Sequence, residues 1–363
     1  MSDLRELLER EGERFTLPPG GLERLDRRRR RRERVQIGAL VLALALIGTW
    51  FAISSQEVRP ALDPAEGPRI VDTFSIVARP VAVAEGAGAA WIVSAADRTL
   101  LRLDPATGEI VNEVLLADDV GPPIDVFIWQ GSVWVRTGET STRREWMPPA
   151  VVRIDAATGR TLATMFLDDE TATVAVGAGG VWSTDTAGGV FRRDPHKGTV
   201  AVSRQGPATP VALAVGEGGI WVLGEGRGGV HTGPPIPGRL ARINPRTGST
   251  ASTQVGRNPR HLAVGGGAVW VVSPVDGAVY RIDPATVTVT DRIPVRGLPT
   301  QITVGPTGLW VLDSAGGMLH RIDPERSRVT GSVSVGPGAV AVNAGQQSVW
   351  VARGDGTILR IGN

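Results

Sequence analysis

A small set of polar and charged residues interrupts positions that are otherwise small or apolar in this chain of 363 residues. Each of them begins an alternating apolar stretch whose counterparts start with residues such as Val81 or Ala339. The interrupting residues are Asp125, Arg260, His261, Thr300 and Gln301. Function tends to be placed where a repeated pattern is broken. A carboxylate, a guanidinium, an imidazole and neutral hydrogen-bonding groups together predict a site for a polar or charged ligand.

Two insertions add more side chains of this kind. They span Thr137–Ala150 and Gly224–Gly238, and they contribute Arg143, Arg144, Trp146, Glu225, Arg227 and His231. An exposed aromatic ring beside arginines is a common recognition element. For Trp146 two interpretations stay open, ligand contact and packing of its own loop. For Arg260 and His261 the alternative to ligand binding is hydrogen bonding to neighbouring carbonyl groups.

The composition excludes several kinds of chemistry. The chain has no cysteine, which excludes disulfides, thiolate metal sites and cysteine nucleophiles. Its four histidines lack the spacing of zinc ligands. Residues 1–34 hold 11 of the 39 basic and 8 of the 37 acidic residues, so the rest of the chain is nearly balanced in charge. We therefore expect no metal, no cofactor and no nucleic-acid partner.

Tryptophans that recur about every 40 residues indicate the elements that carry these side chains. They are Trp91, Trp134, Trp182, Trp221, Trp270, Trp310 and Trp350. Each lies in a repeat of four short strands, and a period of about 40 residues is typical of β-propeller blades. The sequence predicts an all-β, seven-bladed propeller over residues 69–363. The last repeat lacks its outer strand, and the alternating segment Arg69–Val77 is expected to supply it and close the ring.

Recurring residues within the repeat have structural interpretations. In Asp104–Gly108, Asp155–Gly159 and Asn244–Gly248 the first side chain is expected to cap a turn, and the glycine to adopt a positive φ. One tryptophan per repeat predicts packing between blades. The recurring arginines are interpreted as repeated ion pairs; they are Arg102, Arg153, Arg193, Arg242, Arg281, Arg321 and Arg360.

The N-terminal part predicts a membrane anchor. Residues 35–53 are 19 consecutive residues without a charge, which as a helix span about 28 Å, close to the hydrocarbon thickness of a bilayer. The arginine-rich run Arg27–Arg34 precedes them, so residues 1–34, with a short amphipathic helix at Ser2–Phe15, are expected in the cytoplasm and against anionic lipid. Residues 54–68 then form a linker to an extracytoplasmic propeller. A cleaved signal peptide is the alternative.

The repeats resemble those of bacterial extracytoplasmic seven-bladed propellers of the YVTN-repeat kind and of virginiamycin B (streptogramin) lyase. The resemblance covers about residues 69–363 and is carried by segments such as Pro259–Val271 and Val279–Thr286, with the pattern P-x-x-hydrophobic-x-V-G followed by W-V and R-I-D-P-x-T. It implies a possible Mg²⁺-assisted elimination, with His261 as base and Asp125 or Asp313 near it. The chain departs from the lyase pattern three residues after each tryptophan, where the family usually has glutamate and only Asp185 and Asp313 are carboxylates here.

In a propeller, the loop entering each inner strand and the loop after each tryptophan strand emerge on one face. The interrupting residues, the two insertions and Asp313 are therefore all expected on that face. The favoured function is a membrane-anchored extracytoplasmic module that binds a protein, peptide or cell-envelope ligand there. The alternatives are a lyase-like enzyme that uses His261 and Mg²⁺, and a signalling role for the cytoplasmic segment.

Overall fold

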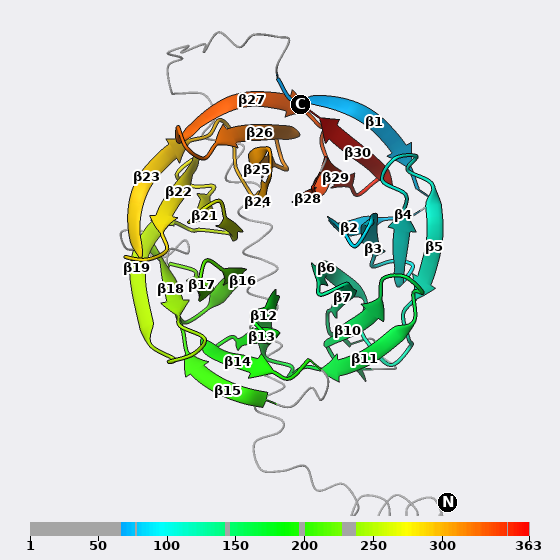
Figure 1. The fold of residues 1–363 in the computed structure, drawn as a ribbon, viewed down its shortest axis with the longest axis horizontal. Helices are drawn as coiled ribbons and strands as arrows, with labels where there is room; N and C mark the ends of the chain where they lie inside the picture. The colour runs from blue at the N-terminus through cyan, green and yellow to red at the C-terminus, as the bar shows by residue number, and fades with distance from the viewer. Residues whose placement is uncertain are drawn as a thin grey trace, which may run out of the picture. The chain divides into compact units, whose positions relative to one another are not determined.

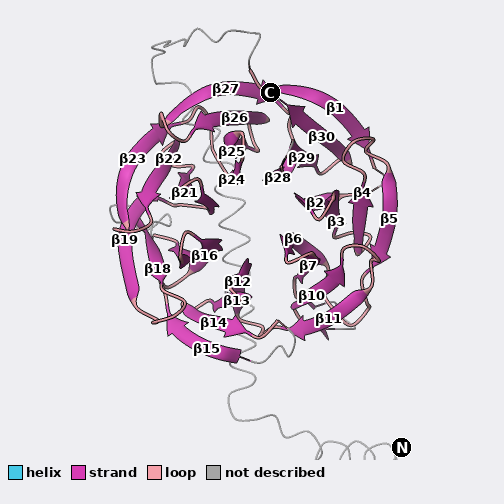
Figure 2. Ribbon diagram, viewed as in Figure 1, coloured by secondary structure: helices cyan, strands magenta, loops and turns pink. Residues whose placement is uncertain are grey.

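The computed structural model describes residues 67–76, 78–141, 146–195, 200–226, 237–346 and 348–362. In these residues all regular structure is β-strand. Seven four-stranded antiparallel sheets are arranged around an axis (Figure 1; Figure 2). In six of them the first strand along the chain is innermost and the last is on the circumference, and in the seventh β28 is innermost and β1 is on the circumference. The predicted all-β, seven-bladed propeller is confirmed.

The first four blades follow one another along the chain. Blade 1 comprises β2 (Pro80–Gly86), β3 (Ala89–Ser94), β4 (Thr99–Leu103) and β5 (Ile110–Leu115). Blade 2 comprises β6 (Pro123–Trp129), β7 (Ser132–Thr137), β10 (Ala150–Asp155) and β11 (Thr161–Phe166). Blade 3 comprises β12 (Thr171–Gly177), β13 (Gly180–Asp185), β14 (Gly189–Arg193) and β15 (Val200–Gln205). Blade 4 comprises β16 (Pro210–Gly216), β17 (Gly219–Gly224), β18 (Pro237–Ile243) and β19 (Thr250–Arg257).

Three further blades complete the ring. Blade 5 comprises β20 (His261–Gly265), β21 (Ala268–Ser273), β22 (Ala278–Asp283) and β23 (Thr288–Pro294). Blade 6 comprises β24 (Gln301–Gly305), β25 (Gly308–Asp313), β26 (Met318–Asp323) and β27 (Arg328–Ser334). Blade 7 comprises β28 (Ala339–Ala344), β29 (Val349–Arg353), β30 (Thr357–Gly362) and β1 (Arg69–Ser75). A two-stranded hairpin, β8 (Thr140–Ser141) with β9 (Trp146–Met147), lies in the loop between β7 and β10.

Blade 7 is built from both ends of the described chain. Strand β1 pairs antiparallel with β30, from Arg69 opposite Gly362 to Ser75 opposite Thr357. Figure 1 shows β1 beside the C-terminal strand on the circumference. The predicted closure by Arg69–Val77 is confirmed, with the strand ending at Ser75 and Val77 outside the described residues. Pairing these two strands removes the open edge that each would otherwise present.

The strand register defines two faces of the ring. Each inner strand begins opposite the end of the second strand of its blade, as Pro123 opposite Thr137 and Pro210 opposite Gly224 show. The face where inner strands begin is called the top face, and the face where the inner and second strands are joined by a turn is called the bottom face. The loops after β7 and β17 therefore leave the sheets on the top face.

The seven repeated tryptophans form the core between blades. Each is at most 1% exposed. Trp91 of blade 1 packs with Val126, Val133 and Val135 of blade 2, and the other tryptophans contact the next blade in the same manner. Because each indole packs against two sheets, the buried tryptophans stabilise the arrangement of the blades as well as each sheet.

The repeated arginines have a different role from the predicted ion pairs. In four blades the guanidinium lies 5.2–5.9 Å from the ring centroid of the cross-strand tryptophan, a cation–π contact, in Arg102–Trp91, Arg153–Trp134, Arg242–Trp221 and Arg281–Trp270. In blade 3 the register places Arg192, rather than the predicted Arg193, opposite Trp182. The prediction of repeated ion pairs holds only in part, for Arg193 with Asp168, Arg281 with Asp291 and Arg360 with Asp72.

The turn between the third and fourth strands follows the predicted chemistry. The Asp104 carboxylate accepts the N–H groups of Ala106 and Thr107 at 2.7 and 3.1 Å. Gly108 closes this turn with φ +72°. Equivalent bonds are made by Asp155, Asn244, Asp283 and Asp323. These N–H donors stabilise the charged form and lower the pKa of Asp155, Asp283 and Asp323.

The predicted cytoplasmic segment, membrane span and linker up to residue 66 lie outside the described residues. Among the residues that are described, no helix has the length and apolar character needed to cross a bilayer.

Candidate functional site on the top face and in the axial cavity

A cavity of about 470 Å³ lies on the axis of the ring and receives residues from all seven inner strands. Most of the residues that line it have apolar side chains, including valine and alanine from β2, β12 and β16. The side chains with larger polar groups are Asp125 on β6, Arg136 on β7, His261 on β20, Gln301 on β24 and Asn343 on β28, and Thr173 and Thr303 add hydroxyl groups. Of the five residues with larger polar groups, four lie on inner strands, the strands nearest the axis (Figure 1), and Arg136 lies on the second strand of blade 2.

Asp125 is a carboxylate without a direct counter-charge. Its Oδ1 accepts the N–H of Val126 at 2.8 Å, and Arg136 stands opposite it on β7. None of the ion pairs in the described chain includes Asp125. The Arg136 guanidinium instead donates to the carbonyl of Ala172 in blade 3 at 2.8 Å. Burial raises the pKa of Asp125 to about 6, while the Val126 N–H and Arg136 act in the opposite direction.

His261 lies at the start of β20, in the blade across the axis from Asp125 (Figure 1). Burial lowers the pKa of its imidazole to about 4, with a hydrogen bond to the backbone of Ile302 acting in the opposite direction. The side chain is therefore neutral at pH 7. Its Nδ1 is buried and has no hydrogen-bond partner in the described structure. An unpaired buried nitrogen costs stability, which makes it a candidate contact for a ligand.

Gln301 joins two blades. Its side-chain N–H donates to the carbonyl of Val340 at 2.6 Å, and its oxygen accepts the N–H of Val342 at 3.3 Å. Neighbouring inner strands do not share backbone hydrogen bonds, because they belong to different sheets. The amide of Gln301 satisfies backbone groups of blade 7 and leaves little free capacity for a ligand. Thr300 bonds locally, to the carbonyl of Leu312 and to Ser314.

Arg260 and Glu225, both predicted as ligand contacts, pair with each other. Their side chains are 3.4 Å apart and are 46% and 39% exposed. The pair lies on the top face, where the loop after β17 meets the start of β20. An exposed pair of this kind contributes little to stability and is free to exchange its partner for a charged ligand.

Asp313 lies at the end of β25 and caps a turn. Its side chain is 4% exposed, and Oδ1 accepts the N–H of Gly316 at 2.8 Å. It does not line the axial cavity. The structure therefore brings Asp125, and not Asp313, into the cavity that contains His261.

Other predicted contacts fall outside the described part of the structure. They are Arg143, Arg144, Arg227 and His231, and for Trp146 only the backbone is described, within β9. Sequence reasoning missed Arg136 and Asn343. Arg136 lies two residues after Trp134, where most repeats have an apolar residue, and Asn343 lies opposite Trp350, where four repeats have alanine. Comparison of these two positions across the repeats could have marked both residues.

The carboxylates implied by the lyase resemblance do not gather in the described structure. No group of three or more His, Asp or Glu side chains among the described residues has the arrangement of a metal site. Asp125 lies across the cavity from His261, and the Asp313 carboxylate accepts a hydrogen bond within its own turn. These donors do not fit a Mg²⁺ ion, and we derive no reaction step that passes through one.

The fold and its axial cavity define a seven-bladed β-propeller with a polar, top-facing site. The chain is similar to the crystal structure of virginiamycin B lyase from Staphylococcus aureus, with a TM-score of 0.65 and 16% identity over 82% of this chain and 99% of that one. It is equally similar to a chain of the mitotic checkpoint complex, with a TM-score of 0.66, 10% identity and coverage of 86% and 98%.

The Pan2 WD40 domain of Neurospora crassa is also similar, with a TM-score of 0.64, 11% identity and coverage of 84% and 97%. No family model and no curated protein matches the sequence. At these identities the structural likeness shows the fold alone, and it is shared by proteins of unrelated activity. It confirms the resemblance to the streptogramin lyase propeller at the level of architecture.

Proposed function

We propose that the protein is a membrane-anchored, extracytoplasmic binding module whose top face and axial cavity take a protein, peptide or cell-envelope ligand. The observation that carries this proposal is the pairing state of Asp125 and His261. Both line the axial cavity, one as a carboxylate without an ion pair and one with an unpartnered Nδ1. Buried polar groups are normally satisfied within the protein, so a ligand is the natural source of the missing partners.

The rim of the top face supports the same function. The exposed Arg260–Glu225 pair joins blades 4 and 5 on the top face, and the β8–β9 hairpin belongs to the loop after β7 of blade 2. A central pocket surrounded by exposed charged groups is a common arrangement of a recognition surface. Membrane anchoring rests on the apolar segment 35–53 and the arginines before it, and an extracytoplasmic location follows from their order.

The test is ligand capture with the full chain. The tagged protein is crosslinked in envelope fractions of its own cells, and captured molecules are identified by mass spectrometry. We expect a ligand that is retained by wild type and lost in Asp125→Asn combined with His261→Gln. The matched control is Glu217→Ala on the bottom face, which should retain it. A ligand captured equally by wild type and the double variant would show that the cavity is not the site.

A lyase-like enzyme is the second candidate, favoured by one observation: His261 is neutral and lines the cavity together with Asp125. A neutral imidazole is a competent proton acceptor, although a pKa of about 4 makes it a weak one. The discriminating measurement is consumption of quinupristin, the compound bound in one solved structure of virginiamycin B lyase. Consumption that is abolished by His261→Ala would replace the binding proposal with the enzymatic one.

A further inference from the structure

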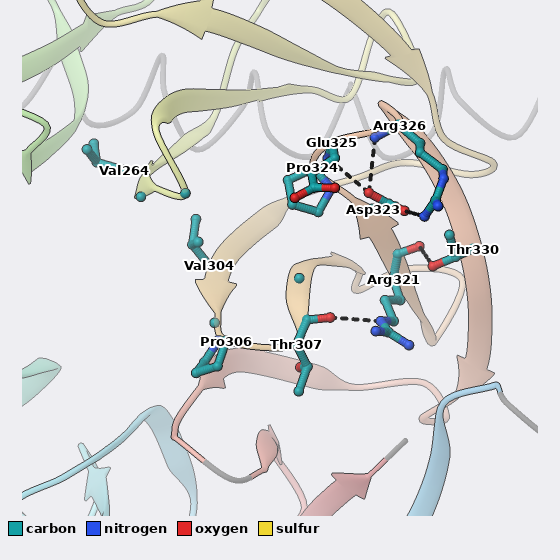
Figure 3. Close-up of a pocket in the computed structure, with 14 residues that line it drawn as sticks. Val264, Val304, Pro306, Thr307, Arg321, Asp323, Pro324, Glu325, Arg326 and Thr330 are labelled. Carbon is teal, nitrogen blue, oxygen red and sulfur yellow. Dashed lines mark hydrogen bonds and ion pairs between the residues drawn. The ribbon is translucent and has the colours of Figure 1, made fainter.

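A second cavity, of about 820 Å³, lies on the bottom face between blades 5 and 6. It is drawn in Figure 3. The turn after β20, with Gly265 and Gly266, forms one side, and the turn between β24 and β25, with Pro306 and Thr307, forms another. The turn Asp323–Arg326 and the side chain of Arg321 complete the wall. It lies on the face opposite the proposed ligand site.

The turn of blade 5 contributes no side chain to the cavity wall. Gly265, Gly266 and Gly267 follow one another, and a Cβ built on Gly266 or Gly267 meets no atom within 4 Å. In blade 4 the equivalent turn carries Glu217, whose carboxylate accepts the N–H of Gly267 at 3.1 Å. The triple glycine thus leaves open space against Val304 and Thr307 of blade 6.

Arg321 is the exception among the arginines that stand opposite the repeated tryptophans. The others use their terminal nitrogens or their ring contact within the protein: Arg102, Arg192 and Arg242 donate to carbonyls, Arg153 stacks on Trp134, and Arg281 and Arg360 form ion pairs. Arg321 uses Nε alone, which donates to the carbonyl of Thr307 at 2.9 Å. In the described structure its two Nη groups have no hydrogen-bond partner and no carboxylate at ion-pair distance.

The bond to Thr307 holds the Arg321 guanidinium at the wall of the cavity, as Figure 3 shows. The Thr307 hydroxyl accepts the indole N–H of Trp310 at 3.2 Å, so its own hydrogen is available to a ligand. Arg326 supplies a second guanidinium, paired with Asp323 at 2.7 Å and 66% exposed. Glu325 also lines the cavity, and its negative charge opposes an anion there.

We propose that this cavity binds a small organic molecule through an oxyanion group, a phosphate or a carboxylate, held by the two free Nη groups of Arg321. A guanidinium whose Nε is fixed presents its remaining N–H groups in the fork geometry that matches two oxygens of such a group. The cavity is larger than one phosphate, so the rest of the ligand lies against Val264 and Val304. This site is separate from the top-face function and does not depend on it.

The experiment is calorimetric titration of the full chain with three probes that share a ring. Phenyl phosphate and benzoate carry the two oxyanions, and benzyl alcohol is the uncharged reference. We expect one or both oxyanions to bind at least 10-fold more tightly than benzyl alcohol, and the stronger of the two identifies phosphate or carboxylate as the group. Arg321→Gln should weaken that binding at least 10-fold, and Glu325→Gln should tighten it two- to fivefold by removing a repelling charge.

The matched control is Arg242→Gln, at the same repeat position in blade 4, where the guanidinium already donates to the carbonyl of Gly218. It should leave binding unchanged. If Arg321→Gln unfolds, as judged by circular dichroism, Arg321→Lys keeps the charge without the fork and should weaken binding severalfold. The proposal is overturned if neither oxyanion binds at millimolar concentration, or if both Arg321 variants bind like wild type. Capture of a top-face ligand is unaffected by either result.

Discussion

The indole N–H of Trp350 in blade 7 donates to the carboxylate of Glu85 in blade 1 at 2.6 Å. In five other blades the indole donates to the carbonyl five residues earlier, within its own blade. The second carboxylate oxygen of Glu85 accepts the N–H of Gln346 at 3.1 Å, and its backbone N–H donates to Asn343 at 2.9 Å. One residue thus joins the first and last blades near the axis, while β1 joins them at the circumference.

We expect Glu85→Ala to destabilise the propeller by about 1–3 kcal/mol, because it leaves the indole N–H of the fully buried Trp350 without a partner. The measurement is chemical denaturation followed by tryptophan fluorescence. Glu217→Ala is the control, since Glu217 bonds only an exposed backbone N–H of the next blade; it should cost less than 1 kcal/mol. Equal losses from the two variants would mean that the Glu85 contact has no special role in closure.

Stability between pH 4 and 6.5 should contain two opposing contributions. The folded pKa of Asp125 is raised from 3.8 to about 6, so folding favours its protonated form and this contribution to stability is lost as pH rises through that range. The folded pKa of His261 is lowered from 6.5 to about 4, so folding favours its neutral form and this contribution is lost as pH falls. Each is on the order of 3 kcal/mol.

Substitutions separate the two contributions. Asp125→Asn should raise stability at pH 7 and have little effect at pH 4. The stability of this variant should increase with pH, because the pKa values of His261 and of the buried His320 are both lowered on folding. His261→Gln should show the opposite pH dependence: compared with wild type, its stability should be raised near pH 4.5 and little changed at pH 7. The measurement is the free energy of unfolding at half-unit pH steps. Parallel pH profiles for both variants would contradict the burial of these groups.

Strand β1 should be needed for a stable ring. A chain that begins at residue 79 lacks the partner of β30 and exposes that strand's edge. It also lacks Asp72, the ion-pair partner of Arg360. We expect it to unfold at a lower temperature than a chain that begins at residue 67, and to form larger species in size-exclusion chromatography. Adding a peptide of sequence RIVDTFS should partly restore the midpoint. Identical melting of the two chains would contradict closure by β1.

Arg193 occupies the position that Ile154, Ile243 and Ile282 hold in other blades, and its side chain is 7% exposed. Its guanidinium pairs with Asp168 of the preceding connection at 2.5 Å. Arg193→Ile should be neutral or stabilising, because an isoleucine suits this core position in the neighbouring blades. Asp168→Ala should instead cost about 1–2 kcal/mol, a reduced value because Asp168 is 75% exposed. Thermal melting of both variants checks the sign of each effect.

Much of the fold can be predicted from the sequence, because the same pattern of strands, tryptophan and turn residues occurs seven times. Trp91 and its counterparts, the turn residues such as Asp104 and Gly108, and the unpaired strand at Arg69 are each specified by short-range pattern. The blade count and the closure therefore follow from counting strands. The role of the repeated arginines was only partly predicted, because a charged residue opposite a tryptophan on a neighbouring strand depends on register, which placed Arg192 and not Arg193 at the ring.

The sites depend on distances that no repeat contains. The break in pattern at Asp125 and His261 was visible in the sequence. The packing of seven sheets around an axis decided that these two residues share one cavity, and that Gln301 and Arg260 have partners in a neighbouring blade. The free Nη groups of Arg321 were invisible, because its sequence context matches that of arginines that are fully engaged. Local sequence determined strands and turns; only the curvature of the ring, which brings residues 40 or more positions apart into contact, decided which polar groups have no partner.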